Sequence, residues 1–207
     1  MPMLEAKVRK KIQNFTLDSE IKDDSRVIAI FGKNGSGKST FLKIIAGFLE
    51  PDNGYVKVDG EDITKYPPWK RKMVLVTPES FLPNTRVKNH LLWGIKDKKK
   101  LDEALEDERI KFLLSFNDHV YKQKTKELSL GMRQRLSLVT AILSNPRYIL
   151  VDEAFSNINN KRDFIQEYFQ LARERNINIV FVSQDLSDAD FAERSYKMEN
   201  GVLKMMS

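Results

Sequence analysis

The chain has 207 residues, of which 41% are hydrophobic, which is enough for one substantial core but not for two independent domains. It contains no cysteine, which excludes disulfides and thiolate metal sites and is typical of proteins from a reducing compartment. The net charge of +6 arises from 35 basic and 29 acidic residues that are interspersed, which favours an ordinary solvated surface, and we expect no nucleic-acid partner.

The sequence contains no stretch that predicts a membrane span. No segment approaches the roughly 18 consecutive apolar residues that a spanning helix needs. The segment Met1 to Lys11 carries Glu5 and several basic side chains but lacks the apolar run of a secretory signal. We therefore expect a soluble chain, or one that another protein holds at a membrane.

In chain order, the first strong signal is an apolar run followed by a glycine-rich loop. Val27 to Phe31 reads as a buried strand. Gly32 to Ser39 then reads Gly-Lys-Asn-Gly-Ser-Gly-Lys-Ser and matches the phosphate-loop pattern G-x-x-x-x-G-K-[ST]. The segment Ser39 to Leu49 has apolar residues at helical spacing and is followed by Pro51 and Gly54. We therefore expect a helix that begins at the loop and ends near Leu49.

The phosphate loop predicts nucleotide binding for a physical reason. Its glycines let the backbone curl, so that successive N–H groups and the positive end of the helix face phosphate oxygens. Lys38 would add charge toward the β- and γ-phosphates, and the Ser39 hydroxyl would bind Mg²⁺. The alternative, a turn without a ligand, leaves a lysine at a positive helix end unexplained. The expected nucleotide contacts are Gly32, Lys33, Asn34, Gly35, Ser36, Gly37, Lys38, Ser39 and Thr40.

After this helix, the sequence predicts a small β-sheet and then a helical segment. Tyr55 to Val58 reads as a strand that pairs with N-terminal strands in an antiparallel sheet, and Met73 to Val76 reads as a buried core strand. The charged run Lys96 to Lys100 is expected to be a solvated loop or helix start. Helical periodicity runs from Phe81 to Asn145 in two apolar stripes, namely Leu101, Ala104, Leu105, Phe112 and Leu113, and Leu136, Val139, Ile142 and Leu143.

Two carboxylates follow the next predicted strand. Tyr148 to Val151 is an apolar run that delivers Asp152 and Glu153 at its carboxyl end, where ligands of open α/β sheets bind. Asp152 would hold the Mg²⁺ shell, and Glu153 would act as general base toward the attacking water. The alternative is an exposed acid pair at a strand end.

The C-terminal part predicts a last core strand and a hairpin. Ile177 to Val182 reads as a buried strand. Asn200 and Gly201 separate Tyr196 to Met198 from Val202 to Met205, and Asn-Gly is the preferred pair for a type I′ turn.

Residues 128–136 read Leu-Ser-Leu-Gly-Met-Arg-Gln-Arg-Leu and resemble the signature motif of ABC ATPases. Ser129 can cap a helix whose N-terminus presents N–H donors to an anion, and Gly131 permits close approach. In that family the anion is the γ-phosphate bound to a second subunit. The resemblance thus implies a homodimer or heterodimer in which Ser129, Leu130, Gly131 and Met132 contact the partner's ATP; the alternative is an ordinary serine-capped amphipathic helix.

The resemblance covers nearly the whole chain. It implies one ABC-type ATP-binding domain over residues 1–207, with an α/β P-loop NTPase core, a mainly parallel sheet and a small antiparallel β lobe. A helical subdomain of about residues 80–145 would be inserted in that core.

Several positions depart from the family pattern. Glu79 stands where the family has a glutamine, and the resemblance implies an outer-shell ligand to the metal there. Asn159 replaces the D-loop aspartate. Gln184 replaces the switch histidine as a catalytic residue; its amide can donate a hydrogen bond to the γ-phosphate but cannot relay a proton, so we expect slow hydrolysis. Phe15 is the nearest candidate to stack on adenine, with strand core as its alternative.

The sequence therefore predicts an ATP-hydrolysing subunit, with ATP and Mg²⁺, that energises a membrane permease from the cytoplasmic face by nucleotide-driven dimer closure. The resemblance places the docking groove for the permease near Phe81, Leu91, Leu92 and Trp93, with helical core as the alternative. A hydrolysis-weak nucleotide switch on a soluble assembly is the alternative function. A small P-loop kinase would leave Ser129 to Leu136 unexplained. The cargo is not predicted, and Glu79 and the signature favour an export-type branch.

Overall fold

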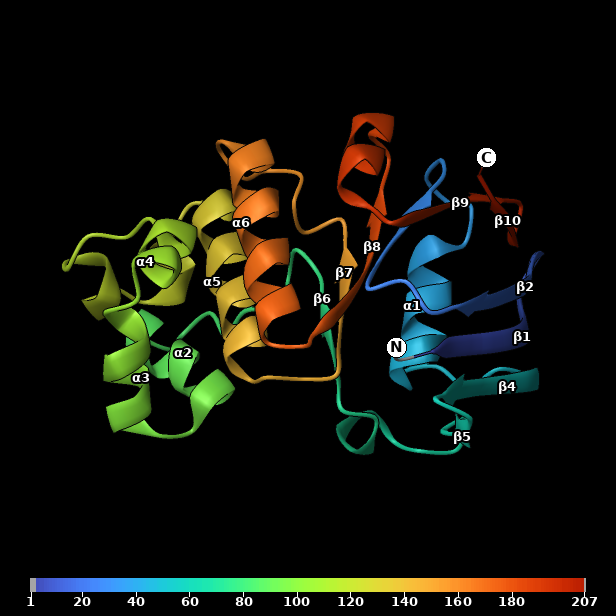
Figure 1. Ribbon diagram of the computed structural model, residues 1–207, viewed down its shortest axis with the longest axis horizontal. Coiled ribbons are helices and arrows are strands. Elements are labelled where there is room, and N and C mark those ends of the chain that lie inside the picture. Colours follow the sequence, from blue (N-terminus) through green and yellow to red (C-terminus); the bar gives the residue numbers. More distant parts are fainter. Residues whose placement is uncertain (1–2, 207) are drawn as a thin grey trace. The chain divides into compact units, whose positions relative to one another are not determined.

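The computed structural model describes residues 3–206 (Figure 1). The chain divides into two compact units. One, which we call the sheet unit, comprises Met1–Leu75, Arg147–Glu153 and Asn178–Ser207; the other, the helical unit, comprises Val76–Pro146 and Ala154–Ile177. The single domain expected over residues 1–207 includes residues 1, 2 and 207, which lie outside the described residues, and it remains a prediction.

The main sheet of the sheet unit has six strands in the order β10-β9-β3-β8-β7-β6. Strand β3 pairs in parallel with β8 and β9, β7 pairs in parallel with β8, and β10 runs antiparallel to β9. Every residue of β3 and β7 is buried, which explains their continuous apolar runs. The predicted core strands are confirmed, except that β8 begins and ends one residue later than expected, and that Met73, Val74 and Leu75 of the edge strand β6 are only partly buried. The strands are β3 (Val27–Phe31), β6 (Met73–Val76), β7 (Tyr148–Asp152), β8 (Asn178–Ser183), β9 (Arg194–Glu199) and β10 (Val202–Met205).

A second sheet is antiparallel, with the order β2-β1-β4-β5. Its strands are β1 (Leu4–Ile12), β2 (Phe15–Asp23), β4 (Asn53–Val58) and β5 (Glu61–Asp62). Buried and more exposed residues alternate along β1 and β2, as expected for strands with one face on the core. The predicted antiparallel lobe is confirmed. The predicted hairpin is also confirmed, since Asn200 (φ 49°) and Gly201 (φ 80°) are both left-handed between β9 and β10.

Helix α1 (Lys38–Ala46) starts at the phosphate loop, as predicted, but ends earlier than Leu49. Gly47 adopts a left-handed conformation (φ 84°) and closes the helix, and Phe48 is 64% exposed. The predicted helix end near Leu49 was wrong, because Phe48 and Leu49 continue the apolar spacing of the helix although its backbone ends at Gly47.

Arg71, which follows the short 3₁₀ helix η1 (Pro68–Lys70), stabilises this end of α1. Its buried guanidinium donates to the carbonyls of Ile44 (2.9 Å) and Ile45 (2.8 Å) in the last turn of the helix. It also donates to the carbonyls of Thr64 (2.7 Å) and Tyr66 (2.8 Å). A cation at a helix C-terminus satisfies free carbonyls and the helix dipole together.

We predict that Arg71→Met lowers the free energy of unfolding by about 3 kcal/mol, because it leaves buried carbonyls without a donor. Urea denaturation followed by circular dichroism measures this loss. Arg9→Met, on an exposed position of β1, is the control and should change stability little. An equal loss in the two variants would contradict the assigned role.

The helical unit contains the α-helices α2 to α6 (Figure 1). The stripe predicted over residues 101–113 is split between two helices, because Asp97 and Asp107 cap separate helix starts with their side chains. Phe112 is consequently half-exposed rather than core. The stripe on α5 is confirmed, since all four of its residues are buried. The helices are α2 (Val87–Ile95), α3 (Lys98–Leu105), α4 (Glu108–Leu114), α5 (Leu130–Leu143) and α6 (Lys161–Glu174), with 3₁₀ turns η2 (Val120–Lys122) and η3 (Thr125–Glu127); a further 3₁₀ helix, η4 (Leu186–Phe191), lies in the sheet unit.

Helix α6 was not predicted from the sequence. Its buried face carries aromatic and aliphatic side chains at helical spacing, namely Phe164, Ile165, Tyr168, Phe169, Leu171 and Ala172.

Lys96 closes α2 in a left-handed conformation and Asp97 caps α3, so the charged run after Lys96 is a helix start, as predicted. Across residues 3–206, no helix combines the length and the apolar character needed to traverse a bilayer.

His90 is buried between α2 and α5. Its Nδ1 lies 2.9 Å from the Thr140 hydroxyl, which itself donates to the Leu136 carbonyl, so Nδ1 carries the proton and donates. Burial lowers the pKa of His90 from 6.5 to about 4. The neutral ring is therefore the form compatible with the fold.

This shift predicts a loss of stability in acid. The unfolded chain takes up a proton on His90 near pH 6.5 while the folded chain does not, so the stabilisation is complete above pH 6.5 and declines as the pH falls toward about 4. The expected decline is about 1.4 kcal/mol per pH unit in that window. Urea denaturation at pH 7, 5.5 and 4.5 should show a shallower decline in His90→Gln than in the parent. His119→Gln, at the exposed second histidine, should follow the parent; identical slopes in all three proteins would refute the assignment.

Candidate functional site

The loop between β3 and α1 is shaped by its glycines. Gly35 (φ 76°) and Gly37 (φ 110°) are left-handed, a conformation that other residues adopt only with strain. A Cβ atom on Gly37 would lie 2.8 Å from the Phe15 ring. Gly37 is the residue before α1, and no side chain caps the helix there. The loop thus presents backbone N–H groups and the positive end of α1 to the same space.

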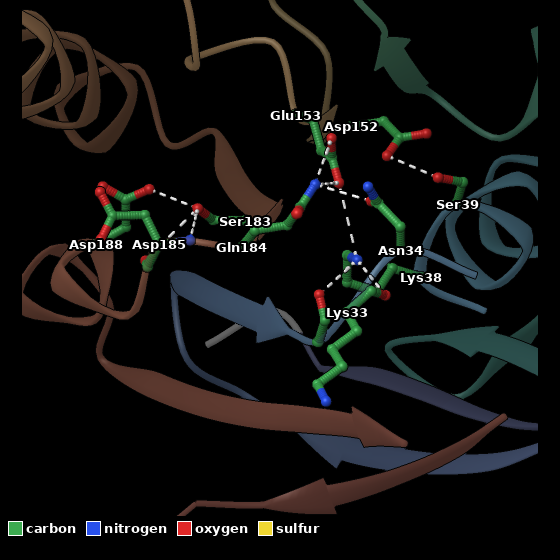
Figure 2. A network of polar contacts seen from close by, with 11 residues as sticks. Lys33, Asn34, Lys38, Ser39, Asp152, Glu153, Ser183, Gln184, Asp185 and Asp188 are labelled. Carbon is green, nitrogen blue, oxygen red and sulfur yellow. Dashed lines mark hydrogen bonds and ion pairs between the residues drawn. The ribbon is translucent and has the colours of Figure 1, made fainter. Parts of the chain in front are cut away.

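Lys38 lies across this loop (Figure 2). Its side chain is only 4% exposed, and Nζ donates to the carbonyls of Gly32 (2.7 Å) and Lys33 (3.1 Å). Nζ is also 3.7 Å from Oε1 of Glu153. The carbonyls of Gly32 and Lys33 and the carboxylate of Glu153 therefore hold the Lys38 ammonium beside the loop, where the sequence predicts that it contacts a phosphate.

Asp152 and Ser39 meet at the carboxyl end of β7. The Ser39 hydroxyl donates to Oδ1 of Asp152 across 2.9 Å, although 113 residues separate them in the chain (Figure 2). Asp152 is 8% exposed, and burial raises the pKa of its carboxyl, while the Ser39 hydrogen bond acts in the opposite direction. The sequence-predicted pair is thus brought together as two adjacent oxygen donors.

These donors suit a magnesium ion that is shared with phosphates. Mg²⁺ usually takes one or two protein oxygens and completes its octahedron with water and phosphate oxygens. Within residues 3–206, no group of three or more His, Cys, Asp or Glu side chains could hold a metal without such help. The pair of Ser39 and Asp152 fits that incomplete donor set.

Glu153 and Gln184, the residues that directly follow β7 and β8, face the loop. Glu153 is left-handed (φ 56°), which turns its carboxylate out of the strand direction toward Lys38. The Gln184 amide donates to Oδ1 of Asn34 (2.8 Å) and to the Glu153 oxygens (3.1 and 3.2 Å). One amide therefore joins the glycine-rich loop to the carboxylate. Sequence reasoning missed this link between Gln184 and Asn34, because only the fold brings together residues that are 150 positions apart.

The turn that carries Gln184 is braced from within the sheet unit. The Ser183 hydroxyl donates to the buried carboxylate of Asp188 across 2.6 Å (Figure 2). The Asp185 side chain accepts from the Ser187 amide at the start of η4. These local contacts hold the end of β8 in place beside the loop.

A cleft of 190 Å³ runs along the loop. Its lining comprises Ile12, Phe15, Asn34, Gly35, Ser36, Gly37, Lys38, Ser39, Thr40 and Glu153. Phe15 also packs against the hydrophobic core, which is the alternative role considered for it, and its stacking on adenine stays a prediction. A larger cleft of 460 Å³ is lined by Gly32–Ser36 and Lys197–Asn200, but not by Lys38, Ser39 or Glu153. The smaller cleft therefore contains the groups suited to bind phosphates.

The signature residues lie in the helical unit. The Ser129 hydroxyl accepts a hydrogen bond from the Met132 amide (3.3 Å) and caps α5 as predicted, and Leu130 is exposed. A Cβ atom on Gly131 would lie 2.4 Å from the carbonyl oxygen of Asn157. Gly131 is therefore required by packing inside its own unit. Its contact with a partner's nucleotide stays a prediction, as do those of Ser129, Leu130 and Met132.

Other predicted residues of the helical unit differ in exposure. Glu79 lies in a turn after β6, where its amide donates to the Thr77 hydroxyl (3.3 Å), and its assignment to the metal shell remains a prediction. Among the proposed docking residues, Leu91 is buried and belongs to the core, whereas Trp93 is 67% exposed. For Leu91 the alternative considered from the sequence, helical core, therefore holds, and permease docking near Trp93 stays a prediction.

Comparisons with known proteins give one consistent family. The family model described as "ABC transporter" matches residues 16–156. The molybdenum import ATP-binding protein ModC of Rhizobium meliloti (strain 1021) is 33% identical over 211 residues, covering 97% of this chain and 59% of the relative. The molybdate/tungstate import ATP-binding protein WtpC of Archaeoglobus fulgidus is 30% identical, covering 90% of this chain and 78% of the relative. The chain thus spans about three fifths of the length of the first of these relatives.

Solved structures agree with this fold. A nucleotide-free ATP-binding cassette from an ABC transporter has a TM-score of 0.81 and 25% identity, covering 98% of this chain and 90% of that one. A bacterial Atm1-family ABC exporter with ATP bound has a TM-score of 0.83 at 20% identity, covering 98% of this chain and 38% of the exporter, which supports the fold alone.

Proposed function

The chain belongs to the ABC transporter family, and from this premise we propose that it is the subunit that binds and hydrolyses ATP for a membrane permease. The observation that carries the proposal is the convergence of Lys38, Ser39, Asp152 and Glu153 on one glycine-rich loop. The chain spans only 59% of the length of its relative ModC, so the ATPase activity, the cargo and the partners of this chain are part of what we propose.

ATP binding begins with the phosphates in the cleft along the loop. The backbone N–H groups of the loop and of the first turn of α1 donate to the phosphate oxygens. Lys38 exchanges the carbonyls of Gly32 and Lys33 for the β- and γ-phosphates, which are stronger, charged acceptors. Phe15 and Ile12, which also line this cleft, offer an apolar surface to the adenine.

Ser39 and Asp152 hold Mg²⁺ in this proposal, with Glu79 in its outer shell. When bound, the ion neutralises charge on the phosphate oxygens. Ser39 belongs to the helix that begins at the loop, so its hydroxyl lies near the phosphates while it remains hydrogen-bonded to Asp152. Burial disfavours the charged form of Asp152, so a cation beside it is stabilising.

Hydrolysis requires a base for the attacking water, and we assign this role to Glu153. Its carboxylate accepts the water proton as the water oxygen bonds to the γ-phosphorus and the bond to ADP breaks. The Gln184 amide orients the carboxylate and can donate to the γ-phosphate, but it cannot carry a proton as an imidazole does. Slow turnover is therefore expected.

Ser129 and the first turn of α5 face the nucleotide of a second subunit in this proposal, and closure of the dimer drives the permease. The permease holds the chain at the inner face of the membrane. Both relatives named above are import proteins by name, which argues against the export-type branch favoured by Glu79 and supports an importer.

Affinity capture from detergent-solubilised membranes tests this role. The tagged protein should retain a polytopic membrane protein, and the captured complex should release phosphate from ATP without an added acceptor. Lys38→Ala is the matched control for the hydrolysis. Capture of soluble proteins alone would support the nucleotide switch, for which Gln184 and Asn159 argue, and phosphate transfer to an acceptor would support the kinase.

A further inference from the structure

One arginine connects four segments of the helical unit. Arg135, in the second turn of α5, donates from Nη1 to the carbonyls of Leu113 (2.8 Å) and Phe112 (3.3 Å), at the end of α4. Its Nη2 donates to the carbonyl of Asn159 (2.7 Å), in the loop before α6. The guanidinium lies over the Phe164 ring of α6, 4.9 Å from the centroid. A single side chain thus holds the loop 157–159 against two helices.

Two neighbours of Arg135 contact the same loop. The buried side chain of Gln134 accepts a hydrogen bond from the Asn157 amide (3.2 Å). Gly131 lies so close to the Asn157 carbonyl that a Cβ atom would be 2.4 Å from that oxygen. Because residues 131, 134 and 135 are spaced by three and four positions, they share one face of α5. The start of α5 and the loop 157–159 therefore form one packed element.

The contact with Asn159 uses the backbone carbonyl. This contact therefore does not depend on the side chain at position 159, where the chain has an asparagine in place of the aspartate of the ABC family. A guanidinium is planar and presents donors in several directions at once, so it can bond to α4 and to the loop together. A lysine ammonium on its flexible stem cannot reproduce that fork.

We propose that Arg135 is a positioning residue that fastens the loop 157–159 to the N-terminal turns of α5. In the proposed function, on which this inference rests, the start of α5 contacts the partner's ATP, and the loop follows Glu153 in the chain. The Arg135 contacts make these two segments move together. Arg135 thereby couples dimer closure to the strand end that carries the chain's own base.

Hydrogen exchange of the nucleotide-free protein tests the positioning. Arg135→Met keeps much of the apolar stem over Phe164 but removes the donors, and exchange at the Asn157 and Ile158 amides should rise about tenfold. Arg135→Lys should give a smaller rise. Arg175→Met is the matched control, because Arg175 also donates to a backbone carbonyl of this unit, that of Ile142 at 3.5 Å. Unchanged exchange in both Arg135 variants, or an equal rise in Arg175→Met, would overturn the proposal.

A second measurement tests the coupling. In a Glu153→Gln background, Arg135→Met should bind Mg-ATP with the affinity of its parent but dimerise about tenfold more weakly with ATP, as measured by analytical ultracentrifugation. Unchanged dimerisation with raised exchange would contradict the coupling. If the Glu153→Gln parent binds no ATP, the proposed function fails, while the exchange experiment still decides the role of Arg135.

Discussion

Replacing Lys38 with alanine should weaken Mg-ATP binding by about a hundredfold or more, because charge-assisted hydrogen bonds to phosphate are lost in a largely buried setting. Lys38 is 4% exposed, and its ammonium already lies among the loop carbonyls and Glu153. The variant also leaves the Glu153 carboxylate beside the phosphates without its counter-charge, which adds repulsion. Isothermal titration calorimetry of the purified protein measures the change.

Two further variants make the Lys38 result interpretable. Lys38→Met keeps the apolar stem and should lose binding to the same extent, which separates the charge from packing. Lys65→Ala removes an exposed lysine of the same unit and should bind Mg-ATP as the parent does. Circular dichroism confirms that each variant is folded. Undiminished affinity in the folded Lys38 variants would remove the basis for placing the phosphates at this loop.

Glu153→Gln should reduce steady-state ATP hydrolysis by a factor of about 10² to 10³, because the amide cannot accept the proton of the attacking water. Binding should persist or become tighter. The carboxylate lies 3.7 Å from the Lys38 ammonium, so its removal frees that cation for phosphate and eliminates a negative charge near the triphosphate. Phosphate release at saturating Mg-ATP measures the rate, and calorimetry measures the affinity.

The expected pattern for Glu153 is therefore a lost rate with retained binding. Glu50→Gln, at an exposed carboxylate of the same unit, should hydrolyse at the parental rate. Hydrolysis by Glu153→Gln as fast as by the parent would assign the base to another group. Loss of rate together with loss of binding would show that Glu153 serves the fold of the loop instead.

The main sheet and the phosphate site follow closely from the sequence. Runs such as Val27–Phe31 and Tyr148–Asp152 are buried on both faces of a parallel sheet, so they contain few polar residues and stand out. Parallel strands place their carboxyl ends at one edge, which is why the Ser39 and Asp152 contact was foreseeable from the motifs.

Helix ends and long-range polar contacts were less predictable. Apolar spacing continues past Gly47, but the left-handed backbone at that glycine ends α1. Helix α6 was missed although its amphipathic pattern at Phe164, Ile165 and Tyr168 is a signal that could have predicted it. Arg71 and Arg135 bond to backbone carbonyls, which every residue possesses, so no pattern of side chains predicts their partners.

Contacts that need a second subunit are of another kind. Ser129 caps its own helix, and this part of the prediction is confirmed by the geometry. In the proposed function, Ser129 and Leu130 contact ATP that is bound to a second subunit, so the sequence of one chain carries only half of that proposed site. Docking of a permease near Trp93 likewise depends on a surface of another chain.

In the proposed function, the triphosphate and its metal lie between the 32–39 loop and Asp152. A crystal structure of Glu153→Gln grown with Mg²⁺ and ATP tests it most directly. We expect phosphate oxygens bonded to the backbone amides of the loop, Mg²⁺ on the Ser39 hydroxyl, and the Lys38 ammonium moved from the Gly32 carbonyl to phosphate. If ATP binds elsewhere, with the Lys38 ammonium still on the Gly32 carbonyl and no metal on the Ser39 hydroxyl, the phosphates do not lie at this loop.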